Sequence, residues 1–129
     1  MTIVEQIVSR EIDAAIVYES EHVIAFADHD PINFGHILIC PVVAYETFID
    51  LPEEIALEIN RVAKDLYRRI EIAFQPDGIS FIQNNGFFND LSHYHLHIFP
   101  RFKDDQFGWV CSELGVQSVD KLRQTLVNL

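Results

Sequence analysis

Histidine occupies every second position in one segment near the end of the chain, which reads Ser92-His93-Tyr94-His95-Leu96-His97-Ile98-Phe99. Side chains alternate between the two faces of a β-strand, so this spacing predicts a strand with three imidazoles on one face. The other face holds Tyr94, Leu96 and Ile98, which are residue types that pack in hydrophobic cores. We therefore expect a strand that is buried on one side and presents a row of histidines on the other.

Patterns on both sides of this segment predict the remaining secondary structure. The clearest is a long helix from about Leu51 to Phe74, with Asp50 as its cap and an apolar residue every three or four positions. The other elements are a helix of about two turns after Thr2, strands at 16–19, 23–26, 36–40 and 79–82, and a last helix at about 118–128 that buries Leu122 and Leu126. This order predicts an α+β domain with a mainly antiparallel, five-stranded sheet and helices covering one face.

Length, charge and cysteine content narrow the class of protein. The 129 residues suit one domain, and 20 acidic against 9 basic residues give a net charge of −11, which repels nucleic-acid polymers. No apolar stretch reaches the roughly 20 residues that span a membrane, and the N-terminus lacks a signal-peptide pattern. The two cysteines, Cys40 and Cys111, argue against a disulfide framework or a structural zinc site. We expect a cytoplasmic protein that binds neither nucleic-acid polymers nor membranes.

The spacing of the histidine row leaves three interpretations open. The histidines could be exposed polar residues of a two-sided strand, the ordinary interpretation of a lone histidine. They could bind a metal, but the α-carbons of His93 and His97 would lie about 13 Å apart, so one ion would readily reach only two rings. They could line an extended anion such as a phosphate chain, with one neutral imidazole as nucleophile and its neighbours as donors. The geometry favours the third interpretation.

The same segment resembles a known motif. His93–Phe99 has the His-x-His-x-His pattern of the histidine triad (HIT) superfamily of nucleotide hydrolases and transferases, and Pro100-Arg101 is a common continuation there. Three earlier landmarks look like that family too: Glu11–Glu19, Ala25-Phe26-x-Asp28-x-x-Pro31 and Gly35-His36-x-Leu38-x-x-Pro41. Together these motifs span residues 3–101 and are far more specific than the triad alone. The resemblance implies a single HIT-like domain over residues 1–129, with 102–129 as a less typical C-terminal extension.

The resemblance also implies catalytic roles, position by position. His95 matches the family nucleophile, which attacks the α-phosphorus of a nucleotide and forms a nucleotidyl-histidine intermediate that water resolves. His93 and His97 match the flanking histidines that orient the nucleophile and hold phosphate oxygens. His36 matches a fourth histidine near the same phosphate.

A nucleotide-binding set follows from the same match. Asp28 corresponds to the carboxylate that accepts hydrogen bonds from both ribose hydroxyls, a task that suits an ionised carboxylate. The remaining expected contacts are an apolar slot for the base (Ile3, Val4, Ile7 and Phe26), an asparagine ahead of the triad (Asn84), and donors near the phosphate (Asn89 and Arg101). The resemblance implies a homodimer, and we expect no cofactor and no metal at these residues.

The chain departs from the family pattern just before the triad. Asn89 and Asp90 stand where the family often has glutamine and then serine or threonine, which contact the phosphate and the leaving group. Asparagine still donates a hydrogen bond, whereas an ionised Asp90 only accepts and repels phosphate. The leading hypothesis is hydrolysis at the α-phosphorus of a dinucleoside polyphosphate, a nucleoside phosphoramidate or an acyl-adenylate. The alternatives are a nucleotide-binding module with little catalysis and a metal-binding protein that uses the three histidines.

Overall fold

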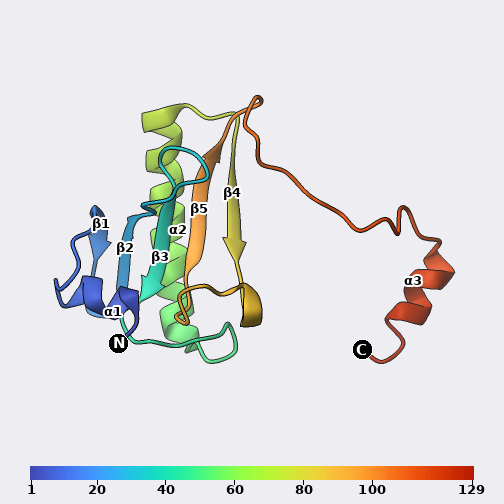
Figure 1. Cartoon of the computed structure of the whole chain (residues 1–129), viewed down its shortest axis with the longest axis horizontal. Coiled ribbons are helices and arrows are strands. Elements are labelled where there is room, and N and C mark those ends of the chain that lie inside the picture. The colour runs from blue at the N-terminus through green and yellow to red at the C-terminus, as the bar shows by residue number, and fades with distance from the viewer.

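The computed structural model describes residues 1–129 and contains a five-stranded sheet (Figure 1). Its elements are, in chain order, α1 (Ile3–Val8), β1 (Ile16–Glu19), β2 (Val23–Ala27), β3 (Ile37–Pro41), α2 (Glu53–Phe74), β4 (Gly78–Gln83), the 3₁₀ turn η1 (Gly86–Phe88), β5 (Leu96–Arg101) and α3 (Val119–Thr125). The strands follow the order β1-β2-β3-β5-β4, and every neighbouring pair is antiparallel. The predicted α+β architecture is therefore confirmed.

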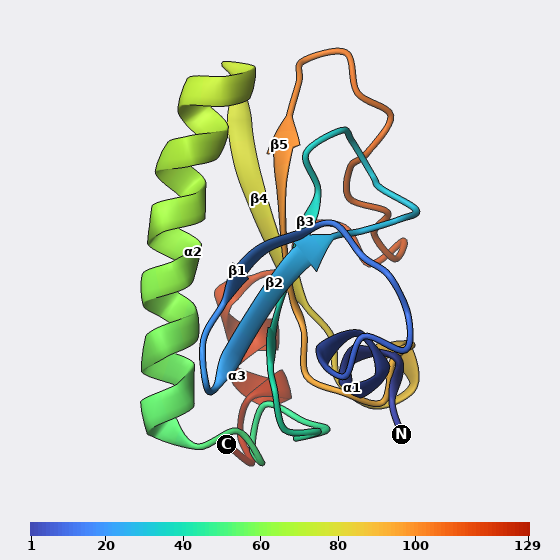
Figure 2. The same ribbon diagram turned by 90° about the vertical axis from the view of Figure 1, so that its left-hand side faces the viewer.

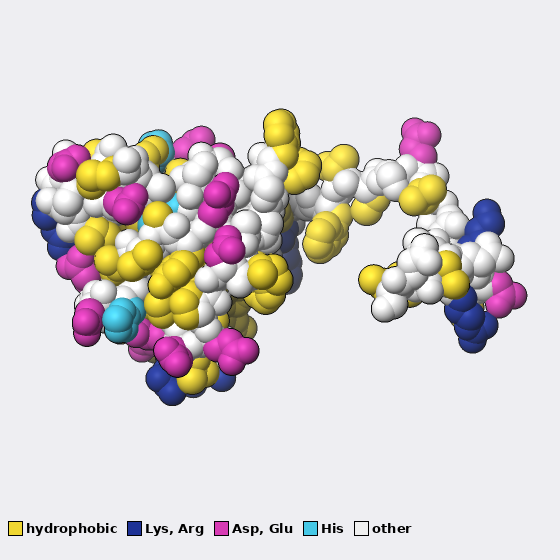
Figure 3. Space-filling view, turned by 90° about the horizontal axis from the view of Figure 1, so that it is seen from below, with side chains coloured by type: hydrophobic (Ala, Val, Ile, Leu, Met, Phe, Trp, Pro, Cys, Tyr) yellow, Lys and Arg dark blue, Asp and Glu magenta, His cyan; other side chains and the backbone are white.

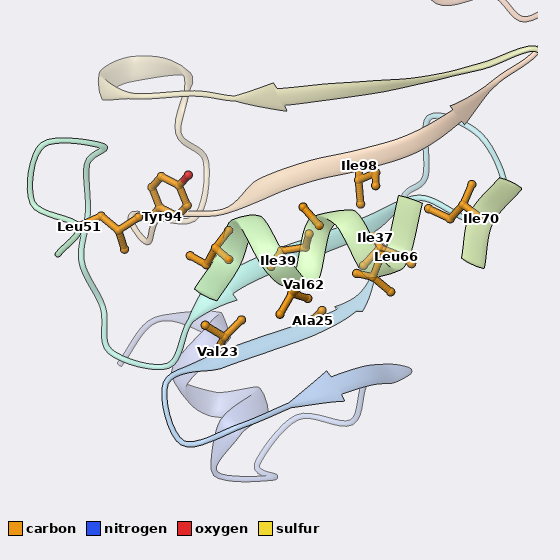
Figure 4. Packing of buried hydrophobic residues seen from close by; sticks show 12 residues of the cluster. Val23, Ala25, Ile37, Ile39, Leu51, Val62, Leu66, Ile70, Tyr94 and Ile98 are labelled. Carbon is orange, nitrogen blue, oxygen red and sulfur yellow. The ribbon is translucent and has the colours of Figure 1, made fainter. Parts of the chain in front are cut away.

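The long helix α2 covers one face of the sheet (Figure 2). Its buried side packs on strand residues that point the same way, as Figure 4 shows for Val62 and Leu66 against Val23, Ala25 and Ile39. Fully burying one such aliphatic side chain contributes roughly 1.5–3 kcal/mol. This layer is the main hydrophobic core.

The short helix α1 packs on the opposite face, so the expectation that the helices cover one face is wrong (Figure 2). The reason is that β2 and β3 are apolar on both sides. A second buried cluster joins Val4 and Ile7 of α1 to Ile24, Phe26, Leu38 and Cys40 of these strands. The predicted capping box is present, because Thr2 Oγ1 accepts from the Glu5 backbone and the Glu5 carboxylate accepts from the Thr2 backbone.

The start of α2 differs from the prediction. The helix begins at Glu53, with Pro52 at the cap position and no capping side chain, rather than at Leu51 with Asp50 as its cap. The Asp50 carboxylate instead accepts hydrogen bonds from the backbone and the hydroxyl of Thr47. A local turn of this kind competes with a helix cap for the same carboxylate.

The strand β5 is shorter at its start than predicted. It begins at Leu96, so His93 and His95 precede it, and Ser92 has a φ of 53°, in the left-handed region. The alternation of side chains nevertheless continues through the irregular part. Tyr94 is buried in the core that α2 covers, whereas His95 lines a cavity on the other side.

After β5 the chain first packs back on the domain, where the rings of Phe102 and Phe107 contact those of Phe34 and Phe99. The rest of the C-terminal tail extends away from the sheet (Figures 1 and 3). The predicted helix is present as α3, capped by Ser118. Leu122 is 46% exposed and Leu126 54% exposed, so the prediction that they are buried is wrong. The reason is that α3 stands apart from the domain, with its apolar side chains uncovered. None of the helices combines the length and hydropathy needed to cross a membrane.

Candidate active site

A cavity of about 670 Å³ opens between α1, the end of β2 and the histidine segment. This volume lies in the range of small-molecule binding sites. One part of the wall is apolar and comes from α1, β2 and β3, with Ile3, Ile7, Phe26 and Leu38. The other part is polar and holds His95, His97 and four aspartates. The cavity therefore joins an apolar slot to a cluster of ionisable groups.

The hydrogen bonds of His95 decide which of its nitrogens is free. Its Nδ1 lies 2.8 Å from the carbonyl oxygen of His93. A carbonyl only accepts, so Nδ1 carries the proton and the neutral ring has a bare Nε2. Every buried polar side-chain atom has a hydrogen-bond partner, and His95 Nε2 has none within the chain. This Nε2 is therefore not buried but open to the cavity that His95 lines. A lone pair on a fixed ring thus faces the cavity.

The first triad histidine, His93, is buried and does not line the cavity. Its Nε2 donates to the carbonyl of Pro41 at 2.7 Å, which leaves Nδ1 as an acceptor. The Thr2 hydroxyl, 2.8 Å away, donates to that Nδ1 and so ties α1 to the triad. These two hydrogen bonds fix His93 in place, and its backbone carbonyl in turn accepts from His95 Nδ1 and orients the His95 ring.

The same reasoning fixes the protons on His36 and His97. The backbone N–H of Ile32 donates to His36 Nδ1 at 3.0 Å, so the neutral His36 ring is protonated on Nε2. That Nε2 donates to His97 Nδ1 at 2.9 Å, which leaves His97 protonated on Nε2. His97 lines the cavity beside His95, with ring centroids 4.8 Å apart. The pair offers one lone pair and one N–H donor.

Burial keeps these supporting histidines neutral. It lowers the pKa of His36 and of His93 below the ordinary value. Burial, together with the neighbouring His95 and His36 when charged, lowers the pKa of His97 to about 4. Near pH 7 these three rings are therefore unprotonated at the second nitrogen, as the hydrogen-bond assignment requires.

One group in this region has the spacing of a metal site. Ligand atoms of Asp28, His36 and His97 all lie within 4.8 Å of one another. However, His36 would have to offer Nε2, and the Ile32 N–H at Nδ1 keeps the ring proton on that Nε2. An ion would have to break this hydrogen bond or bind an imidazolate. The donor set in this arrangement does not fit a metal ion.

Several sequence-predicted nucleotide contacts meet at the cavity, and others do not. The wall includes Ile3, Ile7, Phe26 and Asp28, as expected from the resemblance. The side chains of Val4, Asn84 and Asn89 lie outside it. Val4 is fully buried against the sheet, and Asn89 shapes the loop before the triad by donating to the Glu46 carbonyl and accepting from the Leu91 backbone.

Arg101 is not brought to the cavity either. Its guanidinium forms two hydrogen bonds to the Asp105 carboxylate, at 2.7 and 3.0 Å, and donates to the carbonyl of Phe107. The guanidinium also holds the pKa of the Asp105 carboxyl well below its usual range. Arg101 thus fastens the start of the C-terminal tail, and its charge is already paired.

Known proteins resemble this chain over most of its length. Residues 9–104 match the HIT domain family. The chain belongs to this family. An uncharacterized HIT-like protein of Methanocaldococcus jannaschii is 37% identical over 124 residues, which cover 93% of this chain and 92% of that protein. The crystal structure of a HIT family member from Bacillus subtilis has a TM-score of 0.84 at 31% identity and covers 98% of this chain and 92% of that one.

A relative with a named activity is the adenosine 5'-monophosphoramidase of Saccharomyces cerevisiae. It is 28% identical over 128 residues, which cover 95% of this chain and 78% of that protein.

The supporting groups of this HIT domain were not predicted as site residues. The Thr2 hydroxyl, the Ile32 N–H and the Pro41 carbonyl set the protons on the histidines. Thr2 showed only its capping-box signal, and it lies 91 positions from its partner His93. The other two are main-chain groups, which leave no mark on residue type.

Proposed function

We propose that this HIT domain protein hydrolyses a nucleotide at its α-phosphorus. The observation that carries the proposal is the state of His95, whose Nδ1–H is held by the His93 carbonyl while Nε2 is free at the cavity. A nucleophilic histidine needs a fixed ring with one unprotonated nitrogen aimed at the substrate. The yeast relative named as a monophosphoramidase supports this class of reaction.

The cavity wall supports a nucleoside monophosphate unit as the bound group. The apolar side chains of Ile3, Ile7 and Phe26 offer a slot for a base. Asp28 also lines the cavity, with its Oδ2 3.6 Å from His36 Nε2, and its carboxylate can accept from ribose hydroxyls. The α-phosphate then lies at His95, with the His97 Nε2–H as a donor to one of its oxygens.

The reaction proceeds in two displacements. In the first, the lone pair of His95 Nε2 bonds to the α-phosphorus, and the leaving group departs with the old bonding pair and takes a proton from water. The ring is now cationic, and the hydrogen bond to the His93 carbonyl stabilises it more strongly than before. In the second, water attacks the phosphorus, gives up a proton and releases the nucleoside monophosphate and neutral His95.

Trapping the intermediate tests this proposal. The protein is incubated with adenosine 5'-phosphoramidate, quenched in denaturant at alkaline pH, digested and analysed by mass spectrometry. We expect an adenylyl group on the peptide that carries His95. The variant His95→Asn keeps an N–H for the His93 carbonyl but removes the nucleophile, so it should fold, bind AMP and form no adduct. The matched control is His22→Asn, which changes an exposed histidine outside the cavity.

Turnover, binding and chelation measurements on the same proteins separate the alternatives. Full turnover by His95→Asn would exclude His95 as the nucleophile. Binding of AMP without turnover of any phosphoramidate, acyl-adenylate or dinucleoside polyphosphate would indicate a nucleotide-binding module. Activity that requires a stoichiometric metal, lost on chelation, would indicate metal chemistry at the histidines.

The resemblance-based expectation of a homodimer has support on the other side of the sheet. A second cavity of about 670 Å³ lies between α2 and β4, and its wall includes Tyr67 and Phe81, whose rings stack with centroids 6.4 Å apart. Phe81 is 43% exposed and lies on β4, an edge strand of the sheet. Exposed aromatic side chains beside an unpaired edge are typical of interfaces. Light scattering should give a dimer mass for the wild type and a monomer mass for Phe81→Glu, and a monomeric wild type would contradict the expectation.

A further inference from the structure

One carboxylate of the cavity wall, that of Asp13, comes from the segment that joins α1 to β1. Two backbone hydrogen bonds fix the position of this segment. The Ile12 N–H donates to the carbonyl of Gln6, in the last turn of α1, at 3.2 Å, and the Ala27 N–H, at the end of β2, donates to the Ala15 carbonyl at 2.9 Å. Asp13 therefore lies between α1 and the end of β2, the two elements that supply most of the proposed base slot.

Other aspartates of the wall lie close to the histidines instead. Asp28 Oδ2 is 3.6 Å from His36 Nε2, and Asp90 Oδ1 is 3.5 Å from His95 Nε2. Asp13 forms no contact of this kind with a histidine and takes part in no ion pair. It therefore belongs to the base side of the cavity rather than to the phosphate side.

The carboxylate of Asp13 is oriented by the chain and still has room for a ligand. Its Oδ1 accepts from the Ala14 N–H at 3.0 Å, and Ala14 packs against the buried cluster between α1 and the sheet. Its Oδ2 accepts from no group of the chain, and each carboxylate oxygen can accept two hydrogen bonds. Asp13 is thus a fixed acceptor with free lone pairs at the wall of the apolar slot.

The Watson–Crick edge of a base decides how it meets a carboxylate, which only accepts hydrogen bonds. Guanine presents two adjacent donors at that edge, N1–H and the 2-amino group, and they match the two oxygens of one carboxylate. Adenine presents one donor, the 6-amino group, beside the acceptor N1, which repels the second oxygen. Cytosine and uracil also place an acceptor next to their donor. A carboxylate therefore suits guanine better than the other three bases.

We propose that Asp13 accepts hydrogen bonds from N1–H and the 2-amino group of a guanine base, so that the site prefers guanine nucleotides to adenine nucleotides. This proposal rests on the proposed nucleotide hydrolysis and names the base of its substrate. A purine whose ribose lies at Asp28 has its Watson–Crick edge on the side away from the ribose, and Asp13 is the charged group of the base side. The charge of Asp13 repels the phosphate of every nucleotide alike, so only the base distinguishes them.

Isothermal titration calorimetry with GMP, IMP and AMP tests the proposal. The wild type should bind GMP at least about fivefold more tightly than AMP, the low end for a bidentate pair because Asp13 is exposed to water. IMP keeps N1–H but lacks the 2-amino group, so its affinity should lie between the two. Asp13→Asn keeps an oxygen for the Ala14 N–H but places an amide N–H against the guanine donors, so the preference for GMP should disappear. The control Asp65→Asn makes the same change in net charge on the exposed side of α2 and should keep the wild-type ratio.

The outcomes distinguish this proposal from the one on which it rests. Equal affinity of the wild type for GMP and AMP, a preference for AMP, or an unchanged ratio in Asp13→Asn would overturn the role of Asp13, while an adduct on His95 would still support hydrolysis. A wild type that binds none of the three nucleotides and forms no adduct would overturn both.

Discussion

The half-buried, neutral state of His97 makes the stability of the fold depend on pH, and one substitution can isolate this effect. In the folded protein its pKa is about 4, against an ordinary value of 6.5, chiefly because burial penalises the charged ring. As the pH falls below 6.5 the unfolded chain therefore binds a proton before the folded one does. The contribution of His97 is fully present above that pH and is lost as the pH falls toward 4.

The size of this loss follows from the two pKa values. Linkage gives a decrease in the free energy of unfolding of about 1.4 kcal/mol by about pH 5.5 and about 2.6 kcal/mol by about pH 4.5. The variant His97→Asn has no group that titrates in this range, and its amide oxygen can accept the hydrogen bond that His36 now donates to His97 Nδ1. Its stability should therefore fall less steeply with acid by these amounts.

Urea unfolding followed by far-UV circular dichroism measures the difference. Circular dichroism is preferable to fluorescence, because Trp109 is 96% exposed in the tail and does not report on the core. Titrating groups that do not interact with His97 are present in both proteins and cancel in the comparison of wild type with His97→Asn; only His36 and His95 are coupled to it closely. A control substitution at the exposed His22 should keep the wild-type pH dependence. A difference below about 1 kcal/mol between about pH 7.5 and pH 4.5 would refute the reasoning.

Two further substitutions test individual contacts of the fold, the link between α1 and the triad and the packing of Gly35 on Phe74. Thr2→Val removes both the helix cap and the hydroxyl that donates to His93 Nδ1, so the free energy of unfolding should fall by about 2–4 kcal/mol. The control Thr2→Ser should change it little, and equal stabilities of Thr2→Val and wild type in urea would contradict the link between α1 and the triad. Gly35→Ala would place a Cβ 2.6 Å from Cε2 of Phe74 at a φ of +85°, so a loss of about 2 kcal/mol is expected in thermal unfolding, and a variant with the wild-type Tm would show that the ring moves aside without cost.

Much of the fold was predictable because its signals are local. The alternation around Tyr94 and Ile98 separates the core side of the segment from the histidine side even where no regular strand forms. The capping box at Thr2 marks the start of α1 correctly. The start of α2 was not predictable in this way, because Asp50 has two local partners to choose from and the turn with Thr47 takes its carboxylate.

The sequence predicted the kinds of residue that form the site, but it predicted less well which of the candidate residues reach the cavity. Phe26 and Asp28 reach the cavity because they are two positions apart at the end of β2, so their side chains point to the same face. Arg101 has the right charge for a phosphate contact, but the chain turns just after β5 and brings Asp105 against it. A charged side chain goes to the strongest partner that the fold supplies, and that partner is known only once the turn is known.

Which nitrogens of the site carry protons is set by the fold more than by the residue types. The His93 carbonyl leaves Nε2 as the free nitrogen of His95, and the Ile32 N–H leaves His97 with an N–H donor at its Nε2. Main-chain groups of this kind exist at every position, so a sequence shows where the imidazoles are but not which nitrogen is free. The free Nε2 of His95 therefore depends on the backbone remaining in place. The proposed catalytic arrangement thus includes the contact between Thr2 and His93, although neither side chain reaches the cavity.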